Sequence, residues 1–163
     1  MPKASIGDTL MKHLLALLEY EEGYREKAYY CSAGYPTIGI GKKIGPKAAP
    51  LHFYQFTCSK ELAYLWLDEE VAKVQLQLVK YDWYNKQSDD RKTILISMAY
   101  QMGVQGLLKF RKMIAALDVG NFYEARMQAL DSKWYRDTPL RAKRHAQVLE
   151  TGDLLITYNG LLE

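Results

Sequence analysis

The chain has 163 residues, of which 48% are hydrophobic, so it is long enough to bury a core and its length predicts one domain. Lys and Arg number 22 against 19 Asp and Glu, and the net charge of +3 falls short of the basicity usual in dedicated nucleic-acid-binding proteins. Cys31 and Cys58 are too few for a disulfide framework, and the 3 histidines are too scattered for a zinc site, so we expect no metal and no cofactor.

The N-terminal region shows no export or membrane signal. Its apolar block, residues 14–18, is followed at once by acidic residues, and no small-residue cleavage signature accompanies it. We therefore expect a protein that is kept in the cytoplasm in which it is made and that does not insert into a membrane.

The first predicted element is an amphipathic helix over residues 8–22. Its leucines recur at helical spacing, with Asp8 as the predicted N-cap and Gly23 as the predicted end. Glu21 and Glu22 fall on the flanks of the apolar stripe, whereas Glu19 points away from it. One of these two flanking acids is expected to be partly desolvated, and periodicity does not choose between them.

Two short strands are predicted next, over residues 25–32 and 36–40, with a glycine-bearing turn between them. This pattern is typical of a β-hairpin. Residues 42–58 carry Pro46 and Pro50 and few periodic apolar residues, which predicts a loop with one more strand near residues 53–56.

From there to the C-terminus the pattern is helical. Ser59 is the predicted N-cap of a long helix over residues 60–80, whose mixed polarity suits a helix that joins two lobes. Asp90 is the predicted cap of an apolar central helix that ends at Gly103. Shorter helices are predicted over residues 107–117, 121–130 and 138–150.

These elements predict an α+β fold, mostly α, in which a small β-hairpin lobe at about residues 24–58 is joined by the long helix to a larger helical lobe. The helical lobe takes residues 81–163 together with the N-terminal helix. We expect the whole chain, residues 1–163, to form a single domain because no linker or repeat interrupts it.

The most unusual chemistry of the chain lies between Glu22 and Gly41. Glu22 ends a helix, Cys31 follows after eight residues, and Thr37 follows after five more at the start of the sequence Thr-Ile-Gly-Ile-Gly. This spacing resembles the catalytic motif of the bacteriophage lysozymes typified by that of the T-even phages.

Two further segments carry the same resemblance. Residues 98–103 (MAYQMG) are similar to the end of that family's central helix, and residues 134–144 (WYRDTPLRAKR) are similar to its C-terminal signature. The three segments stand in the family's order and span nearly the whole chain. The departures from the type member are a shorter segment between Gly41 and Ser59, and Cys31 in place of an aspartate.

The resemblance implies a lysozyme-like two-lobed fold and a monomeric endolysin. Its reaction would be hydrolysis of the β-1,4 bond between N-acetylmuramic acid and N-acetylglucosamine in bacterial peptidoglycan. Glu22 would be the general acid, a role that needs a carboxyl group protonated near neutral pH, which desolvation favours. The resemblance also places Arg141 beside Glu22, where a cation would favour the carboxylate instead.

Cys31 would be the nucleophile or the group that orients the attacking water, both of which an ionised thiol can be. An unperturbed thiol is mostly neutral at pH 7. The alternative is therefore a small buried hydrophobe in a peptidoglycan-binding relative that has lost catalysis. Thr37 would hydrogen-bond the attacking water or the sugar, although without the motif it reads as an ordinary strand residue.

Tyr100, Gln101 and Gln128 match the substrate-facing positions of the family, and polar side chains beside an aromatic suit sugar rings. The alternative interpretation of Tyr100, and also of Trp134, is an aromatic residue of the core. A basic run near the C-terminus would attract anionic wall polymer or form a solvated face. It consists of Lys133, Arg136, Lys143 and Arg144.

The resemblance further implies accumulation in the host cytoplasm and action on the cell wall in the periplasm after release through a phage holin. A third hypothesis is a basic, tyrosine- and tryptophan-rich nucleic-acid binder. The chain shows no recognised nucleic-acid-binding motif, so we expect no nucleic-acid partner.

Overall fold

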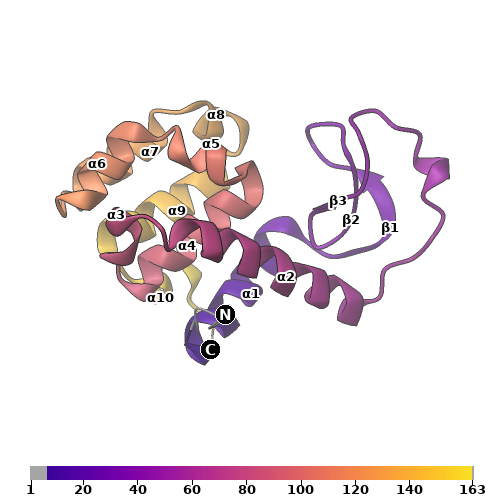
Figure 1. Cartoon of the computed structure of the whole chain (residues 1–163), viewed down its shortest axis with the longest axis horizontal. Helices are drawn as coiled ribbons and strands as arrows, with labels where there is room; N and C mark the ends of the chain where they lie inside the picture. The colour runs from indigo at the N-terminus through magenta and orange to yellow at the C-terminus, as the bar shows by residue number, and fades with distance from the viewer. Residues whose placement is uncertain (1–6, 163) are drawn as a thin grey trace.

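The computed structural model describes residues 7–162 and has two lobes (Figure 1). A small antiparallel sheet and its loops form one lobe, and a group of helices forms the other. The long helix α2 (Lys60–Leu78) runs from the first lobe into the second. The prediction of an α+β fold, mostly α, is confirmed.

Helix α1 (Asp8–Glu22) has the predicted bounds. Its N-cap is Gly7 rather than Asp8, which is the first helical residue and caps nothing with its side chain. Gly23 ends the helix at a φ of 73°, and its N–H donates to the carbonyl of Glu19 at 2.8 Å. The leucines buried by this helix are Leu10, Leu14, Leu17 and Leu18. Their packing fixes where Glu22, the last helical residue, enters the boundary between the lobes.

The small lobe contains the predicted hairpin and one further strand. Strands β1 (Arg25–Tyr30), β2 (Pro36–Gly39) and β3 (Lys42–Lys43) are antiparallel in the order β1-β2-β3. All of β2 is buried, so it forms the centre of the sheet. Thr37 on β2 is paired with Tyr29 on β1 and with Lys43 on β3.

The prediction of a strand near residues 53–56 is wrong. The chain forms a short 3₁₀ helix, η1 (Leu51–Phe53), because the N–H of Phe53 turns back to the carbonyl of Pro50 at 3.1 Å. Within the described residues, the extended contact of this segment is an isolated bridge between Lys27 and Thr57. Aromatic residues in this segment imitate the composition of a strand, but the turn leaves no ladder for them to join.

Helix α2 begins at the predicted cap, since Ser59 accepts a hydrogen bond from the N–H of Leu62 at 3.1 Å. A single stripe of this helix is buried, at positions three or four residues apart. The stripe consists of Ala63, Leu67, Val71, Val74 and Leu78. The rest of the circumference faces outward, which explains the mixed polarity of the sequence.

Helix α4 (Asp89–Met102) is the centre of the helical lobe. Every residue from Thr93 to Ala99 is buried, because α1, α2, α5 and α9 surround the helix. Its cap is Ser88, which accepts from the N–H of Arg91 at 3.3 Å, so the prediction of Asp90 as the cap is wrong. The Asp90 carboxylate instead accepts from the backbone N–H of Leu154 at 2.9 Å. The end of the helix at Gly103 is as predicted.

The region predicted as one helix over residues 107–117 is two, α5 (Val104–Leu108) and α6 (Arg111–Asp118). The break lies at Phe110, whose ψ of 58° is not helical. Helix α7 (Phe122–Leu130) starts at the predicted cap Asn121, and α9 (Pro139–Thr151) starts at the predicted proline and stops at a left-handed Gly152.

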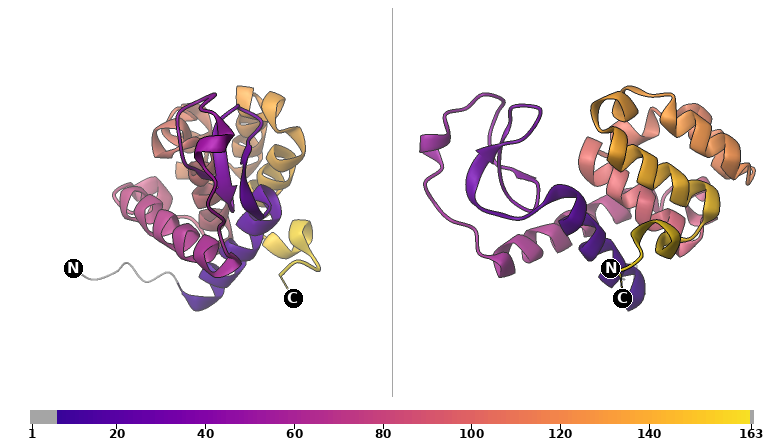
Figure 2. Two further views of the ribbon diagram at one scale, coloured as in Figure 1. Left: turned by 90° about the vertical axis from the view of Figure 1, so that its right-hand side faces the viewer. Right: turned by 180° about the vertical axis from the view of Figure 1, so that it is seen from behind.

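Three short helices were not predicted: α3 (Asp82–Asn85), α8 (Lys133–Asp137) and α10 (Leu154–Tyr158). Each has only four or five residues, too few to show a helical period. Figure 2 shows α9 and α10 on the side of the helical lobe that Figure 1 hides, close to α1. Across the described range, every helix is too short or too polar to span a lipid bilayer.

Candidate active site

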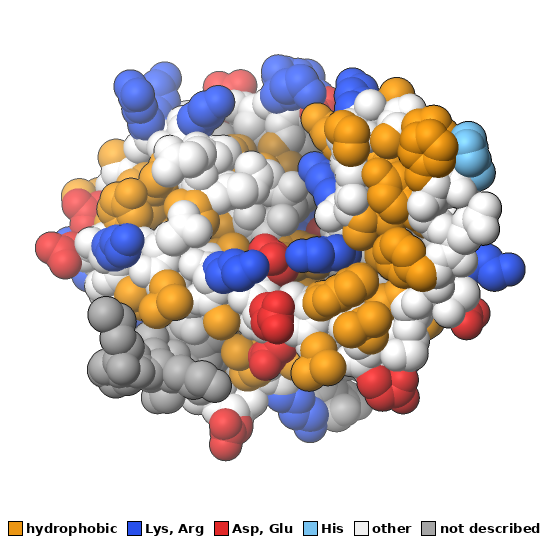
Figure 3. Space-filling model, turned by 45° about the vertical axis from the view of Figure 1, so that its right-hand side comes forward, with side chains coloured by type: hydrophobic (Ala, Val, Ile, Leu, Met, Phe, Trp, Pro, Cys, Tyr) orange, Lys and Arg blue, Asp and Glu red, His pale blue; other side chains and the backbone are white. Residues whose placement is uncertain are grey.

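A cleft of about 670 Å³ lies between the two lobes and contains all three residues of the Glu22–Gly41 motif. Its walls come from α1, the sheet and its turn, α2, and the end of α4. Figure 3 shows this hollow, with acidic and basic side chains gathered across it. The structure therefore brings Glu22, Cys31 and Thr37 together on one surface.

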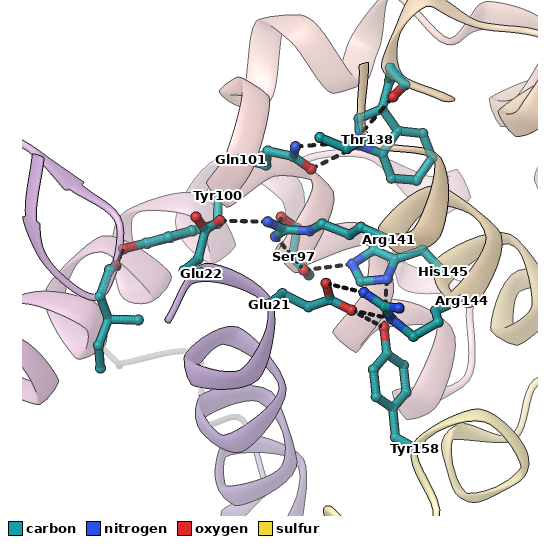
Figure 4. Close-up of polar contacts among 12 residues, drawn as sticks. Glu21, Glu22, Ser97, Tyr100, Gln101, Thr138, Arg141, Arg144, His145 and Tyr158 are labelled. Atoms are coloured by element: carbon teal, nitrogen blue, oxygen red, sulfur yellow. Dashed lines mark hydrogen bonds and ion pairs between the residues drawn. The ribbon is translucent and has the colours of Figure 1, made fainter. Parts of the chain in front are cut away.

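The Glu22 carboxylate is held on one side by a cation. Its Oε1 accepts from Nη1 of Arg141 on α9 at 2.7 Å (Figure 4). The side chain of Arg141 is 7% exposed and that of Glu22 is 19% exposed, so the pair is largely screened from water. Among the described residues, no hydrogen bond is made to Oε2, the second carboxylate oxygen, which lies next to Gly41.

Glu21 and Glu22 have different surroundings although they are neighbours in the sequence. Glu21 is the more buried acid, with a side chain 2% exposed, and it pairs with Arg144 through both oxygens at 2.7 and 2.8 Å. It does not line the cleft. Successive residues of a helix point in different directions, so Glu21 is buried in the core while Glu22 faces the cleft.

Gly41 is required by the close approach of the Glu22 side chain. Its φ is +68°, and a Cβ added there would lie 2.7 Å from Oε2 of Glu22 and 3.0 Å from its Cδ. Any side chain at this position would displace the carboxyl group. The Gly-Ile-Gly segment of the motif thus shapes the pocket for the acid.

Cys31 lies in the turn between β1 and β2, where its N–H donates to the carbonyl of Tyr35 at 3.0 Å. Burial raises the pKa of its half-buried thiol, but hydrogen bonds and a cation outweigh burial, so the pKa lies below the ordinary value. The hydrogen bonds come from the backbone of Tyr35 and Ala33, and the hydroxyl of Thr37 adds to them when it turns toward the sulfur. The cation is Lys43 on β3. These surroundings favour the thiolate.

Thr37 is buried at 1% exposure in the central strand, rather than at a strand edge. Its hydroxyl donates to the carbonyl of Tyr35 at 2.8 Å. A hydroxyl has one proton, so Thr37 can donate to the Cys31 thiolate only by rotating away from that carbonyl. The Thr37 hydroxyl can therefore change its hydrogen-bond partner from the Tyr35 carbonyl to Cys31 when the thiol loses its proton.

An ion pair between Lys42 and Glu70 connects two walls of the cleft, and Lys73 of the same helix shares the Glu70 carboxylate. Nζ of Lys42 on β3 lies 3.1 Å from Oε1 of Glu70 on α2, and Nζ of Lys73 lies 3.1 Å from the same oxygen. Burial raises the pKa of Glu70, but these hydrogen bonds and charges hold it below its usual value. The wall opposite Glu22 thus carries more positive than negative charge.

Tyr100 and Gln101 line the cleft, but both are also tied into the fold. The Tyr100 hydroxyl donates to the carbonyl of Ile40 at 2.5 Å, which joins α4 to the small lobe. Burial, followed by the charge of Glu22, raises the pKa of Tyr100. Gln101 accepts from Nε1 of Trp134 at 2.8 Å, and Trp134 is buried, in line with its core reading.

Gln128 does not lie in this cleft. It lines a second cavity of about 680 Å³, formed by α5 to α8, and its Nε2 donates to Glu124 at 2.7 Å. Gln101, Met102 and Asp137 line both spaces, so the cavity adjoins the cleft. The sequence did not reveal that Gln128 lies outside the cleft, because the position of Gln128 relative to Gln101 is set only by helix packing.

Several polar residues of the site were not predicted. Lys43 and Glu70 show no motif, and their place in the cleft follows from strand pairing and from the angle of α2. His145 was dismissed with the scattered histidines, although it lies on the buried face of α9 with Arg141, one turn earlier. That i,i+4 spacing was the available signal. Arg144, assigned to a basic run, turns inward to Glu21.

Within residues 7–162, no cluster of three or more His, Cys, Asp or Glu side chains could hold a metal ion. Cys31 and Cys58 are both free thiols.

The mostly helical fold with its small antiparallel sheet is lysozyme-like. The sequence model described as phage lysozyme matches residues 19–149, so the chain belongs to the phage lysozyme family, as its motifs indicated.

Similar proteins agree with this assignment. The chain is 29% identical over 161 residues to the pre-baseplate central spike protein Gp5 of Enterobacteria phage T4, with 85% of this chain and 28% of that protein aligned. It is 29% identical over 163 residues to probable T4-type lysozyme 1 of Dictyostelium discoideum, covering 85% of this chain and 94% of that protein. For probable T4-type lysozyme 2 of the same organism the identity is 26% over 170 residues, covering 89% and 98%. The chain thus spans little more than a quarter of the spike protein but nearly all of each lysozyme. These matches support a lysozyme-like function.

Replacing Gly41 with alanine should lower the proposed activity of the cleft about 100-fold without unfolding the protein. The added Cβ strains a positive-φ position by roughly 1–2 kcal/mol, and it displaces the Glu22 carboxyl. Gly120→Ala is the matched control, since Gly120 has a φ of +74° and no atom within 4 Å of the added Cβ. Denaturant unfolding should show similar losses of stability in the two variants. Equal activity in both would contradict the account of Gly41.

Iodoacetamide should alkylate Cys31 before Cys58, by roughly tenfold or more in rate. The reason is that the pKa of Cys31 is lowered, whereas burial raises the pKa of Cys58, which is 0% exposed. Mass spectrometry of peptides after timed labelling measures both rates in one sample. Equal labelling of the two thiols in the folded protein would show that the turn does not activate Cys31.

Proposed function

We propose that this protein is an endolysin with muramidase activity, which hydrolyses the β-1,4 bond between N-acetylmuramic acid and N-acetylglucosamine in bacterial peptidoglycan. The observation that carries the proposal is the meeting of Glu22, Cys31 and Thr37 in one cleft of a phage lysozyme family chain. A glycosidase of the common type needs an acid for the leaving oxygen and a second group for the anomeric carbon or its water.

Glu22 is the proposed general acid. Because Arg141 donates to Oε1, the proton of the acid form belongs on Oε2, the oxygen without a hydrogen bond in the described part of the chain. Oε2 would transfer this proton to the glycosidic oxygen as the bond to the anomeric carbon breaks. Arg141 then stabilises the carboxylate that the transfer leaves behind.

Cys31 is the proposed second group. As a thiolate it can attack the anomeric carbon and form a thioglycoside that water later hydrolyses, or it can take a proton from a water that attacks directly. The first route retains and the second inverts the anomeric configuration. Thr37 would stabilise the thiolate or the water through its hydroxyl. In this proposal Tyr100 and Gln101 contact the sugar, and Gln128 contacts a part of the substrate in the adjoining cavity.

The biological setting is part of the proposal. The protein would act as a monomer, accumulate in the host cytoplasm and reach the peptidoglycan in the periplasm through a holin, lysing the host for phage release. It would neither insert into a membrane nor bind nucleic acid. Lys42, Lys43 and Lys73 support a wall substrate, since the stem peptides of peptidoglycan carry carboxylates.

The second candidate is a peptidoglycan-binding relative without catalysis. The observation in its favour is the thiol at Cys31, where the family's type member has a carboxylate. This candidate predicts that the protein sediments with the wall but releases no reducing sugar from it.

Glu22→Gln should abolish clearing of purified peptidoglycan, with a loss of at least about 100-fold, because an amide cannot donate the acidic proton. The control is Glu26→Gln, an exposed acid of β1 outside the cleft, which should clear at the wild-type rate. Turbidity and newly formed reducing ends are measured together. Clearing by Glu22→Gln at the wild-type rate would refute the proposed acid, and wall binding by an inactive wild type would establish the second candidate.

Cys31→Ala should lose most of the activity, by roughly 100-fold, while Cys31→Asp should keep it, because a carboxylate can replace a thiolate as nucleophile or base. Cys58→Ala provides the comparison, since Cys58 is buried outside the cleft. Full activity of Cys31→Ala would remove Cys31 from the mechanism. NMR of the first-formed anomer from the wild type then distinguishes retention from inversion.

A further inference from the structure

A chain of buried hydrogen bonds runs from Glu22 into the helical lobe (Figure 4). Arg141, which holds Glu22, also donates from Nη2 to Oγ of Ser97 on α4 at 3.0 Å. Oγ of Ser97 lies 2.7 Å from Nε2 of His145 on α9. Ser97 and His145 are both 0% exposed, so they depend on each other for hydrogen bonds.

The chain continues on the far side of the imidazole ring. Nδ1 of His145 lies 2.8 Å from the hydroxyl of Tyr158 on α10, and that hydroxyl lies 2.8 Å from Oε1 of Glu21. Arg144 closes this end by pairing with Glu21. The network therefore connects Glu22 to Glu21 through three other helices, although the two acids are adjacent on α1.

The two ends of the network fix the direction of every bond. A guanidinium only donates, so Oγ of Ser97 accepts from Arg141 and has its own proton available for Nε2 of His145. A carboxylate only accepts, so Tyr158 gives its single proton to Glu21, and its oxygen must accept from Nδ1 of His145. Both arguments give the same neutral ring, with the proton on Nδ1.

The other states of the ring leave a buried group without a partner. With the proton on Nε2, Tyr158 would need its one proton for both Nδ1 and Glu21. A charged ring would donate to Oγ of Ser97, which already accepts from Arg141, so the Ser97 proton would lose its acceptor. The charge would also lie next to the cations Arg141 and Arg144. Burial and those two charges lower the pKa of His145 well below its usual value, while the acids of the network, Glu21 and Glu22, are each already paired with an arginine.

We propose that His145 is a positioning residue for the reaction. As the neutral Nδ1–H tautomer it orients the hydroxyl of Ser97, which in turn orients the Arg141 guanidinium. Arg141 then holds Glu22 with Oε2 toward the cleft. The inference rests on the proposed role of Glu22. Arg141 depends on this support, because its Nε has no hydrogen-bond partner among the described residues and its remaining contact, to the carbonyl of Ser97, is 3.3 Å long.

The tautomer is tested first, without reference to activity. In protein labelled with ¹⁵N-histidine, long-range ¹H–¹⁵N spectra distinguish protonated from unprotonated ring nitrogens, and loss of signals in His145→Gln assigns the ring among the 3 histidines. We expect a protonated Nδ1 and an unprotonated Nε2 at neutral pH. A proton on Nε2, or on both nitrogens, would overturn the inference.

Activity on solubilised peptidoglycan tests the positioning. His145→Leu should lower kcat by about 3- to 30-fold and leave KM within about twofold, because the effect reaches Glu22 through intermediates and not through the substrate. His145→Gln should restore kcat to within about threefold of wild type, since an amide also has one acceptor and one donor for Ser97 and Tyr158. Wild-type kcat in a folded His145→Leu variant, or failure of Gln to rescue, would overturn the proposal.

Tyr158→Phe provides a second variant in case His145→Leu does not fold. It removes one hydroxyl, leaves the aromatic ring of residue 158 in place and does not alter Arg141 or Glu22. We expect kcat to fall about 2- to 10-fold. An unchanged kcat would again count against the network. If Glu22→Gln keeps activity, the proposed function fails, whereas the ¹⁵N spectra report on the network in either case.

Discussion

The cleft depends on the ion pair between Arg141 and Glu22. It joins α9 to the last residue of α1, so two segments separated by 119 positions meet where the small lobe begins. Removing one partner of a buried pair costs roughly 3–5 kcal/mol because the other charge stays desolvated. An exposed pair such as Lys133 with Asp137 contributes at most about 1 kcal/mol. The pair also makes the two carboxylate oxygens different, because Oε1 is bonded to Arg141 and Oε2 has no hydrogen bond in the described part of the chain.

The protein uses two adjacent acids for different purposes. Glu21 is buried with Arg144 and Tyr158 and fastens α1 to α9 and α10, while Glu22 reaches the cleft. Burial alone does not show which acid lines the cleft, since the side chain of Glu21 is the less exposed of the two. What distinguishes Glu22 is its neighbourhood, namely a glycine that leaves room for the carboxyl and a turn that carries a thiol and a cation.

The small lobe contributes precise placement with few residues. Its central strand is buried on every position, and pairing on both sides fixes the direction of Thr37. The turn that follows β1 surrounds Cys31 with backbone donors, and Lys43 on the third strand adds charge. Tyr100 joins this lobe to the central helix through the carbonyl of Ile40, so the positions of the two walls are coupled.

The sequence by itself determined the long helices, the hairpin, the caps at Ser59 and Asn121, and the grouping of Glu22, Cys31 and Thr37, because these follow from local periodicity, local hydrogen bonds and a spacing typical of one family. It misjudged residues 53–56 and 107–117, where single backbone turns override composition. Only the tertiary structure decided which of Glu21 and Glu22 faces the cleft, that Gln128 lies in a separate cavity, and that His145 belongs to the support of Glu22. These outcomes depend on contacts between helices distant in the sequence, and no local pattern encodes the angle at which two helices pack.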